Sequence, residues 1–171
     1  QVYDYRLLLD TKDRGISRTL LLFGKRELEH RIMLQEIVKE GSRVFDIGAN
    51  IGYYAVMEAL MVGKEGEVIA IEPSPSNVRL LEKNVALNDQ KNIRIVSAAV
   101  SDIDGSKTFF LSDKSNLGTF HNVGSGVEHL NGQTVDVNTL SLNTLAGQFG
   151  APDLIRMDVE GHEVAVLRGL I

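Results

Sequence analysis

Five acidic and imidazole side chains follow short apolar runs, in positions where they could take up a proton or bind the polar groups of a ligand. Asp46, Glu72 and Asp158 each close an apolar run of the kind that forms a buried strand, and Glu160 and His162 follow shortly after. The carboxyl ends of parallel strands meet at one edge of a sheet, where open α/β proteins bind their ligands. Carboxylates accept hydrogen bonds there, and imidazole titrates near neutral pH. This convergence predicts a ligand site with acid–base capacity; the alternative is a charged turn on a solvated edge.

The turn Asp46–Gly52 reads DIGANIG and lies between an apolar run and a helical pattern. Gly48 and Gly52 can adopt backbone angles closed to other residues and leave no side chain between the main chain and a ligand. N–H groups at the start of the following helix are unpaired, so the turn could hold a carboxylate or a phosphate. It does not fit the dinucleotide fingerprint, because Asn50 and Tyr53 stand where the second and third glycines belong. The alternative is a tight strand–helix turn without a ligand.

The elements that must position these residues alternate between strands and helices. Apolar runs indicate strands at 43–45, 67–72, 92–97 and 152–158, and helical spacing indicates helices at 26–39, 53–60, 76–88 and 164–168. Three strands separated by two helices predict a parallel βαβαβ unit, and the helix at 26–39 is expected to pack on the sheet. Weaker signals are an outlying strand at 3–9, a helix or strand at 16–23, and extended segments at 107–111 and 134–140.

Two strand ends could bind a nucleoside. Glu72 stands about 20 residues after the glycine turn, where a carboxylate can accept both ribose hydroxyls. It could instead belong to the start of the next helix, which Ser74 can cap and which Pro75 fits at its first position. The small side chains of residues 98–100 leave room for a flat adenine ring, or they are core residues.

The stretch from Ser112 to Gln133 is rich in Gly, Ser and Asn and contains His121 and His129. A loop of this length in a compact domain is usually functional or disordered. Its place after the third strand would let it hang over the mouth of the ligand site. It is interpreted as a lid over the substrate or, equally, as a surface loop.

Composition limits the classes of function. The 171 residues suit one domain of ordinary composition, and the net charge of −5 without a basic run speaks against a broad phosphate-binding surface, so no nucleic acid is expected. The absence of cysteine excludes disulfides, zinc–thiolate sites and thiol catalysis and is consistent with a cytoplasmic location. No apolar stretch is long enough to cross a bilayer, so no membrane is expected as a partner. The oligomeric state is not indicated.

Four stretches together resemble the FkbM-type branch of the class I S-adenosylmethionine (SAM)-dependent methyltransferases. They are residues 44–54 (VFDIGANIGYY), 71–74 (IEPS), 97–102 (SAAVSD) and 155–163 (IRMDVEGHE). The resemblance implies a Rossmann-like fold, a mostly parallel sheet with helices on both faces, and SAM as cofactor. The implied activity is methyl transfer, usually to a hydroxyl oxygen of a sugar, polysaccharide or secondary metabolite, with a small molecule or glycan as acceptor. Arg156 stands where the family usually has lysine, and Asn143 where aspartate is common.

The resemblance also assigns roles. Gly48, Asn50 and Gly52 would hold the methionine end of SAM, Glu72 the ribose, and Ala98 and Ala99 the adenine edge. The complete expected cofactor-binding set is Asp46, Gly48, Ala49, Asn50, Gly52, Tyr53, Glu72, Pro73, Ala98, Ala99 and Asp158, with Asp158 facing the methionine amine. Candidate catalytic residues are His162, Glu160 and Asp158, with His121 on the lid next. No evident set of metal ligands is present, so no metal is expected.

Residues 1–40 are expected to form a strand and helix packed on the core, and residues 41–171 the SAM-binding domain. The chain reaches Ile171 before the later strands of a seven-stranded methyltransferase sheet, so the domain is expected to be incomplete at this end. Two other functions stay open: a SAM-binding module without catalysis and a nicotinamide-dependent oxidoreductase.

Overall fold

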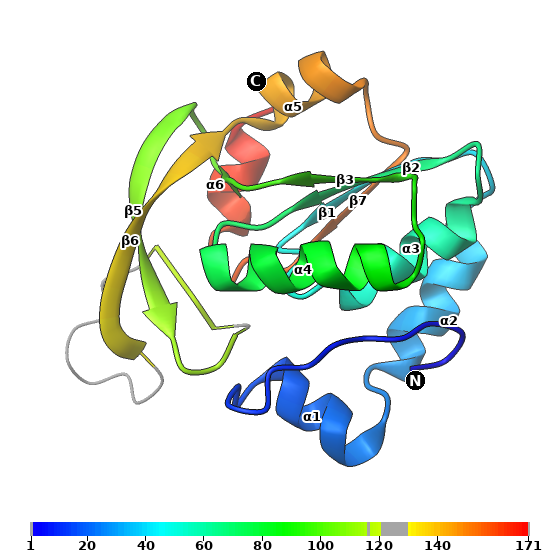
Figure 1. Cartoon of the computed structure of the whole chain (residues 1–171). Helices are drawn as coiled ribbons and strands as arrows, with labels where there is room; N and C mark the ends of the chain where they lie inside the picture. Colours follow the sequence, from blue (N-terminus) through cyan, green and yellow to red (C-terminus); the bar gives the residue numbers. More distant parts are fainter. Residues whose placement is uncertain (1, 116, 121–129, 171) are drawn as a thin grey trace.

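A computed structural model describes residues 2–115, 117–120 and 130–170. Its centre is a four-stranded parallel sheet in the order β3-β2-β1-β7 (Figure 1). The strands are β1 (Arg43–Ile47), β2 (Glu67–Ile71), β3 (Ile93–Val96) and β7 (Leu154–Met157). The predicted βαβαβ unit is confirmed by the first three strands. Chain winding changes direction between β1 and β7, and this is where open α/β sheets bind ligands.

Both faces of the sheet are covered, which is why its strands read as nearly continuous apolar runs. Val44, Val68 and Ala70 point into one core with α3 (Tyr53–Val62) and α4 (Pro75–Leu87). Phe45 and Ile71 point into the other, with α5 (Leu142–Phe149) and α6 (Glu163–Arg168). The predicted Rossmann-like arrangement with helices on both faces is confirmed. The helix α5 was not predicted.

A second, three-stranded sheet stands beside the carboxyl ends of the parallel strands (Figure 1). It consists of β4 (Ala99–Val100), β5 (Gly105–Ser112) and β6 (Leu130–Leu140). β5 and β6 are antiparallel, and β6 pairs in parallel with β4, which follows directly after β3. The extended segments expected at 107–111 and 134–140 are therefore the two arms of one hairpin.

The N-terminal segment differs from the prediction. Residues 3–9 form no strand; only an isolated bridge joins Val2 and Tyr5. Side chains of α4 and of its C-cap accept from the backbone there instead: the Leu8 N–H donates to Asn84 Oδ1 (2.6 Å) and the Arg6 N–H to Asn88 Oδ1 (2.9 Å). Residues 16–23 form the helix α1 (Ile16–Phe23), one of the two alternatives considered.

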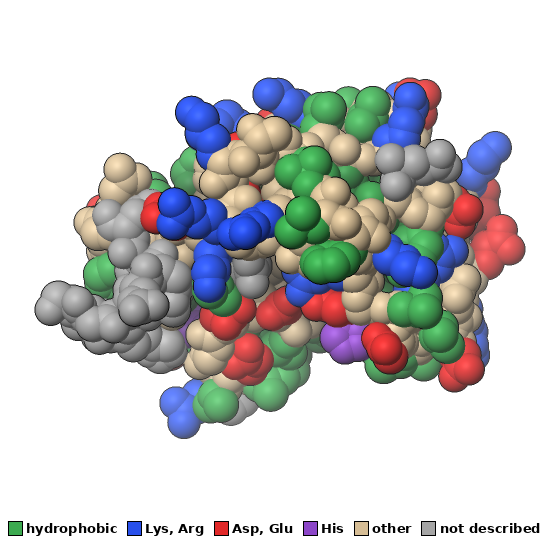
Figure 2. Space-filling model, turned by 90° about the horizontal axis from the view of Figure 1, so that it is seen from below, with side chains coloured by type: hydrophobic (Ala, Val, Ile, Leu, Met, Phe, Trp, Pro, Cys, Tyr) green, Lys and Arg blue, Asp and Glu red, His purple; other side chains and the backbone are tan. Residues whose placement is uncertain are grey.

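The helix predicted at 26–39 exists as α2 (Leu28–Ile37), and it packs on the core through Leu34. Leu28, Ile32, Met33 and Ile37 are 43–50% exposed, and within the helix only Leu34 is buried. The reason is that α3 and α4 already cover that face of the sheet. Figure 2, which views the molecule from the α1 side, shows hydrophobic side chains between acidic and basic ones on that surface of the molecule.

Among the described residues, no helix has the length and apolar character to span a membrane.

Candidate functional site

A pocket opens at the carboxyl edge of the parallel sheet and has three walls. The inner wall is formed by residues that follow β1, β2 and β7. The N-terminal segment contributes Ile16 and Arg26, and the second sheet with its loop contributes Phe109, Ser115 and Phe120. Most of the predicted site residues line this pocket: Gly48, Ala49, Asn50, Tyr53, Glu72, Pro73, Ala98, Ala99, Asp158, Glu160 and His162. Asp46 and Gly52 do not, and His121 lies outside the described residues.

The glycine turn is closed by its own hydrogen bonds. The N–H groups of Gly48 and Ala49 both donate to the Ile71 carbonyl (2.9 and 3.0 Å), and that of Asn50 donates to Glu72 Oε2 (2.9 Å). The Gly52 N–H donates to the Ala49 carbonyl (2.9 Å). These donors are therefore not open to a ligand. At the start of α3, by contrast, the N–H groups of residues 53–55 have no acceptor among the described residues.

Glycine is required at two positions of the turn, and neither reason is contact with a ligand. Gly48 has φ +82°, and a Cβ there would lie 2.2 Å from the Asp158 carbonyl oxygen. Gly52 has φ +90°, and its Cβ would lie 2.7 Å from Leu81 of α4. Gly52 permits α4 to pack closely against the turn, and its expected contact with the cofactor stays a prediction.

Glu72 is buried and held in one orientation. Its Oε1 accepts from the Ser74 N–H and Asn77 Nδ2 (both 3.0 Å), and its Oε2 accepts from the Asn50 N–H. Burial raises the pKa of Glu72 to about 7, although these hydrogen bonds act to lower it. The carboxyl lines the pocket and also satisfies the start of α4, where Pro75 is the first residue. The interpretation of Glu72 as part of the start of α4 agrees with these contacts, and ribose binding stays a prediction.

Arg156 links the ends of β1 and β7. Its guanidinium donates to Asp46 Oδ1 (2.8 Å) and Asp158 Oδ2 (3.2 Å) and lies 3.8 Å from the centre of the Tyr54 ring. Asp46 is fully buried behind the pocket wall, and burial raises its pKa while Arg156 opposes that shift. Asp46 is thus a partner of Arg156 and does not line the pocket, and its expected contact with the cofactor stays a prediction. Asp158 remains half exposed at the pocket.

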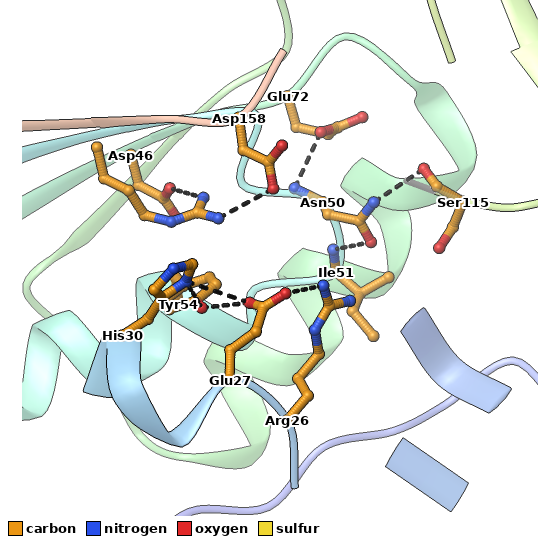
Figure 3. A network of polar contacts seen from close by, with 11 residues as sticks. Arg26, Glu27, His30, Asp46, Asn50, Ile51, Tyr54, Glu72, Ser115 and Asp158 are labelled. Carbon is orange, nitrogen blue, oxygen red and sulfur yellow. Dashed lines mark hydrogen bonds and ion pairs between the residues drawn. The ribbon is translucent and has the colours of Figure 1, made fainter. Parts of the chain in front are cut away.

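The N-terminal segment supplies a wall that sequence reasoning missed. Tyr53 Oη donates to the Arg26 carbonyl (2.6 Å), and the Tyr54 hydroxyl donates to Glu27 (Figure 3). Glu27 also pairs with Arg26, and His30 Nδ1 lies 3.0 Å from Tyr54 Oη. Burial acts to raise the pKa of Glu27, but hydrogen bonds from Arg26 and Tyr54 lower it overall. Nothing local in the sequence signals a partner of Glu27 about 27 residues away.

The loop after β5 closes the third side. The Ser115 carbonyl accepts from Asn50 Nδ2 (2.8 Å) and Asn77 Nδ2 (3.0 Å). The Ser115 N–H and hydroxyl donate to the two carboxylate oxygens of Asp13 (2.8 and 2.9 Å). One residue of the expected lid thereby joins the glycine turn to the N-terminal segment. Phe120 stacks edge-on against Phe109, with ring centres 5.1 Å apart.

His162 is buried at the end of the pocket where β3 gives way to β4. Its Nε2 lies 3.0 Å from Ser101 Oγ, and its ring centre is 4.7 Å from that of Phe120. Ser101 Oγ also donates to Asp102 (2.8 Å) and accepts from Lys107 (2.7 Å). A hydroxyl has one proton and two lone pairs, so this arrangement assigns the His162 Nε2 as a donor to Ser101.

The comparisons with known proteins agree with this geometry. Residues 46–171 match the Methyltransferase FkbM domain family, and the chain belongs to this family. It is 28% identical to the hexuronic acid methyltransferase AglP of Haloferax volcanii over 82% of this chain and 54% of that protein. It is 33% identical to a protein-L-isoaspartate O-methyltransferase of Caenorhabditis elegans over 44% of this chain and 34% of that protein.

A crystal structure of a SAM-dependent methyltransferase from Aquifex aeolicus is 31% identical to this chain, with a TM-score of 0.38. The similarity covers 39% of this chain and 36% of that chain. The chain spans about a third to a half of the length of the two curated relatives named above. The family assignment confirms the resemblance that was drawn from the sequence, and it also confirms SAM as the cofactor. The contacts that each residue makes with SAM remain predictions.

Proposed function

We propose that this chain is the SAM-binding part of a methyltransferase and that its pocket directs methyl transfer to a hydroxyl oxygen of a sugar, polysaccharide or other small molecule. The observation that carries the proposal is the pocket at the β1/β7 switch point, where Glu72, Asp158 and the glycine turn come together. The likeness to a hexuronic acid methyltransferase supports a sugar acceptor.

The chemistry asks little of the protein beyond positioning. SAM supplies a methyl group already activated by its sulfonium; the acceptor oxygen forms the new bond to carbon as the carbon–sulfur bond breaks, and the hydroxyl proton leaves to a base. Holding the reacting atoms in line can contribute about 7–11 kcal/mol. In this proposal Glu72 accepts the ribose hydroxyls, Asp158 pairs with the methionine amine, and Ala98 and Ala99 border the adenine.

Among the candidate bases, we propose Glu160 ahead of His162. Glu160 is exposed, lines the pocket and is held in a left-handed conformation with φ +47° directly after the β7 turn. His162 is buried against Phe120 and committed through Nε2 to Ser101, close to the alanines proposed for the adenine edge. A general base must reach the acceptor proton. The position of His162 fits a wall of the adenosine subsite better.

The test is calorimetric titration of the chain with SAM and with S-adenosylhomocysteine, using Glu72→Ala as the control. We expect saturable binding that the control loses. Incubation with SAM and a panel of neutral and acidic sugars should then release S-adenosylhomocysteine. Binding without turnover would favour a non-catalytic module, and saturable binding of NADH in place of SAM would favour the oxidoreductase. Adding RNA to the panel tests the prediction that nucleic acid is not an acceptor.

A further inference from the structure

The methionine end of SAM carries a carboxylate, and the structure leaves few groups to bind it. The N–H groups from Gly48 to Gly52 already donate within the protein. The open N–H groups at the start of α3 carry a partial positive charge but form a weak site alone. A carboxylate taken out of water needs a charged partner or several hydrogen bonds. The question is which cation at this end of the pocket can provide one.

Two arginines line the pocket among the described residues, and they differ in how many acidic partners each guanidinium already has. Arg156 is committed to Asp46 and Asp158 and stacked on Tyr54, so its charge is balanced by acids of the protein itself. Arg26 is 22% exposed and donates through Nη2 to Glu27. A guanidinium has five N–H donors in a planar fork, so the other donors can serve a carboxylate.

The backbone of Arg26 is fixed on the helix that begins at the glycine turn. Its carbonyl accepts from Tyr53 Oη, and Tyr53 is the first residue of α3. Glu27, held by the Tyr54 hydroxyl, restrains the guanidinium from the other side. Figure 3 shows Arg26 and Asp158 on either side of Asn50. A cation and an anion thus border the place where an amino acid's carboxylate and ammonium would lie.

We infer that Arg26 binds the carboxylate of SAM's methionine moiety, together with the open N–H groups at the start of α3. This inference rests on the proposed function, because it names a contact in the same pocket. It moves the recognition of the methionine end from the glycine turn to the N-terminal segment. Residues 1–40 then contribute directly to the cofactor site, in addition to covering the core.

The experiment is calorimetric titration of wild-type, Arg26→Ala and Arg26→Lys chains with SAM and with 5′-methylthioadenosine, which lacks the amino-acid part. A hydrogen bond to a charged group is worth about 1.5–3 kcal/mol, so Arg26→Ala should weaken SAM binding roughly 10- to 100-fold. Arg26→Lys should recover part of the loss because it keeps the charge. Binding of 5′-methylthioadenosine should not change in either variant.

Arg31→Ala is the matched control, since Arg31 lies on the same segment but pairs with Asp4 and stacks on Tyr3, away from the pocket. Its SAM affinity should stay within about twofold of wild type. Equal losses for SAM and 5′-methylthioadenosine in Arg26→Ala, or none for SAM, would overturn the inference alone. If the wild-type chain bound neither compound, the proposed function itself would fail. Comparing the affinities of the wild-type chain for SAM and for decarboxylated SAM tests the same contact without a variant. Equal affinities would refute the contact.

Discussion

The inner and outer walls of the pocket are held together in different ways. The inner wall continues the parallel sheet: Asp158 N–H donates to the Ile47 carbonyl, and Gly48 N–H to that of Ile71. The outer wall is joined by side chains from distant segments, as where Ser115 meets Asp13 and Asn50. Main-chain bonds within a buried sheet open only on global unfolding, whereas loop contacts open locally. Substitutions in the inner wall should therefore change the free energy of unfolding, and substitutions in the outer wall should change chiefly the affinity for the ligand.

The largest effect is expected from Gly48→Ala. The new Cβ would lie 2.2 Å from the Asp158 carbonyl oxygen and would hold a side chain at φ +82°. Left-handed strain and overpacking together predict a loss of roughly 2–6 kcal/mol in the free energy of unfolding, measured by urea denaturation.

Gly24→Ala separates the cost of left-handed strain from that of overpacking. Gly24 also has a positive φ (+69°), but nothing lies within 4 Å of the added Cβ. It should lose only about 1–2 kcal/mol. Similar losses in both variants would mean that the β1 and β7 turns can move apart, and the inner wall would be less rigid than its hydrogen bonds indicate.

Glu72 of the inner wall should affect both the stability of the fold and the affinity for SAM, and the two should depend on pH in opposite directions. Burial raises its pKa from an ordinary 4.5 to about 7. A raised carboxyl pKa makes the folded chain most stable when Glu72 is protonated, so its contribution declines as pH rises from about 4.5 to about 7. Ribose hydroxyls require the ionised carboxylate as acceptor. SAM affinity should therefore fall about tenfold between pH 8 and pH 6.

Titration calorimetry across this pH range, beside urea melts of the unliganded chain, measures the two trends. Glu72→Gln should remove the pH dependence of binding at the expense of affinity. An affinity that is flat from pH 6 to pH 8 in the wild type would contradict the ribose contact.

The inner wall could be predicted because its residues follow strands directly in the sequence. Glu72 and Asp158 are marked by the apolar runs before them, and the glycine turn by its spacing. The outer wall carries no such local signal. Arg26 is held at the pocket by a contact with Tyr53 of α3, and Ser115 by contacts with Asp13. Sequence periodicity does not encode such tertiary contacts.

The partners of single residues could not be predicted for a related reason. Asp46 and Gly52 belong to the turn that defines the site, but their partners, Arg156 and Leu81, lie on other elements. Sequence position placed both residues at the sheet edge, and only the packing shows that they lie behind the pocket surface. The exposed side of α2 shows the same limit at the scale of a helix, because apolar residues at helical spacing do not reveal that only Leu34 of them is buried.

Glu58 tests whether the core behind the inner wall is optimised for stability. It is fully buried on α3, and neither carboxylate oxygen has a hydrogen-bond partner among the described residues. Burial raises its pKa well above the ordinary value, with Asp46 adding to the shift and Arg156 opposing it. Glu58→Leu should raise the free energy of unfolding at pH 8 by about 1–3 kcal/mol, because an unsatisfied buried carboxyl is removed.

Urea denaturation at pH 8 and pH 5 measures this gain, which should be smaller at the lower pH, where the wild-type carboxyl is protonated. Leu145→Met, a volume-conserving change in the other core, controls for repacking. A destabilised Glu58→Leu would indicate that the carboxyl balances Arg156.

The smallest effect on stability, and the sharpest test of the outer wall, is expected from Asp13→Ala. Asp13 accepts from the N–H groups of Gly15 and Ser17 as well as from Ser115, so its removal frees the loop that carries Ser115 from the N-terminal segment. Unfolding should change by about 1 kcal/mol, while SAM affinity falls about 3- to 10-fold because the third wall loosens. Asp10→Ala is the control, since among the described residues the Asp10 carboxylate accepts a local hydrogen bond from the Lys12 N–H and none from Ser115. If both variants bound SAM like the wild type, the wall at Ser115 would not contribute to cofactor binding, and the pocket would depend on its inner wall and Arg26.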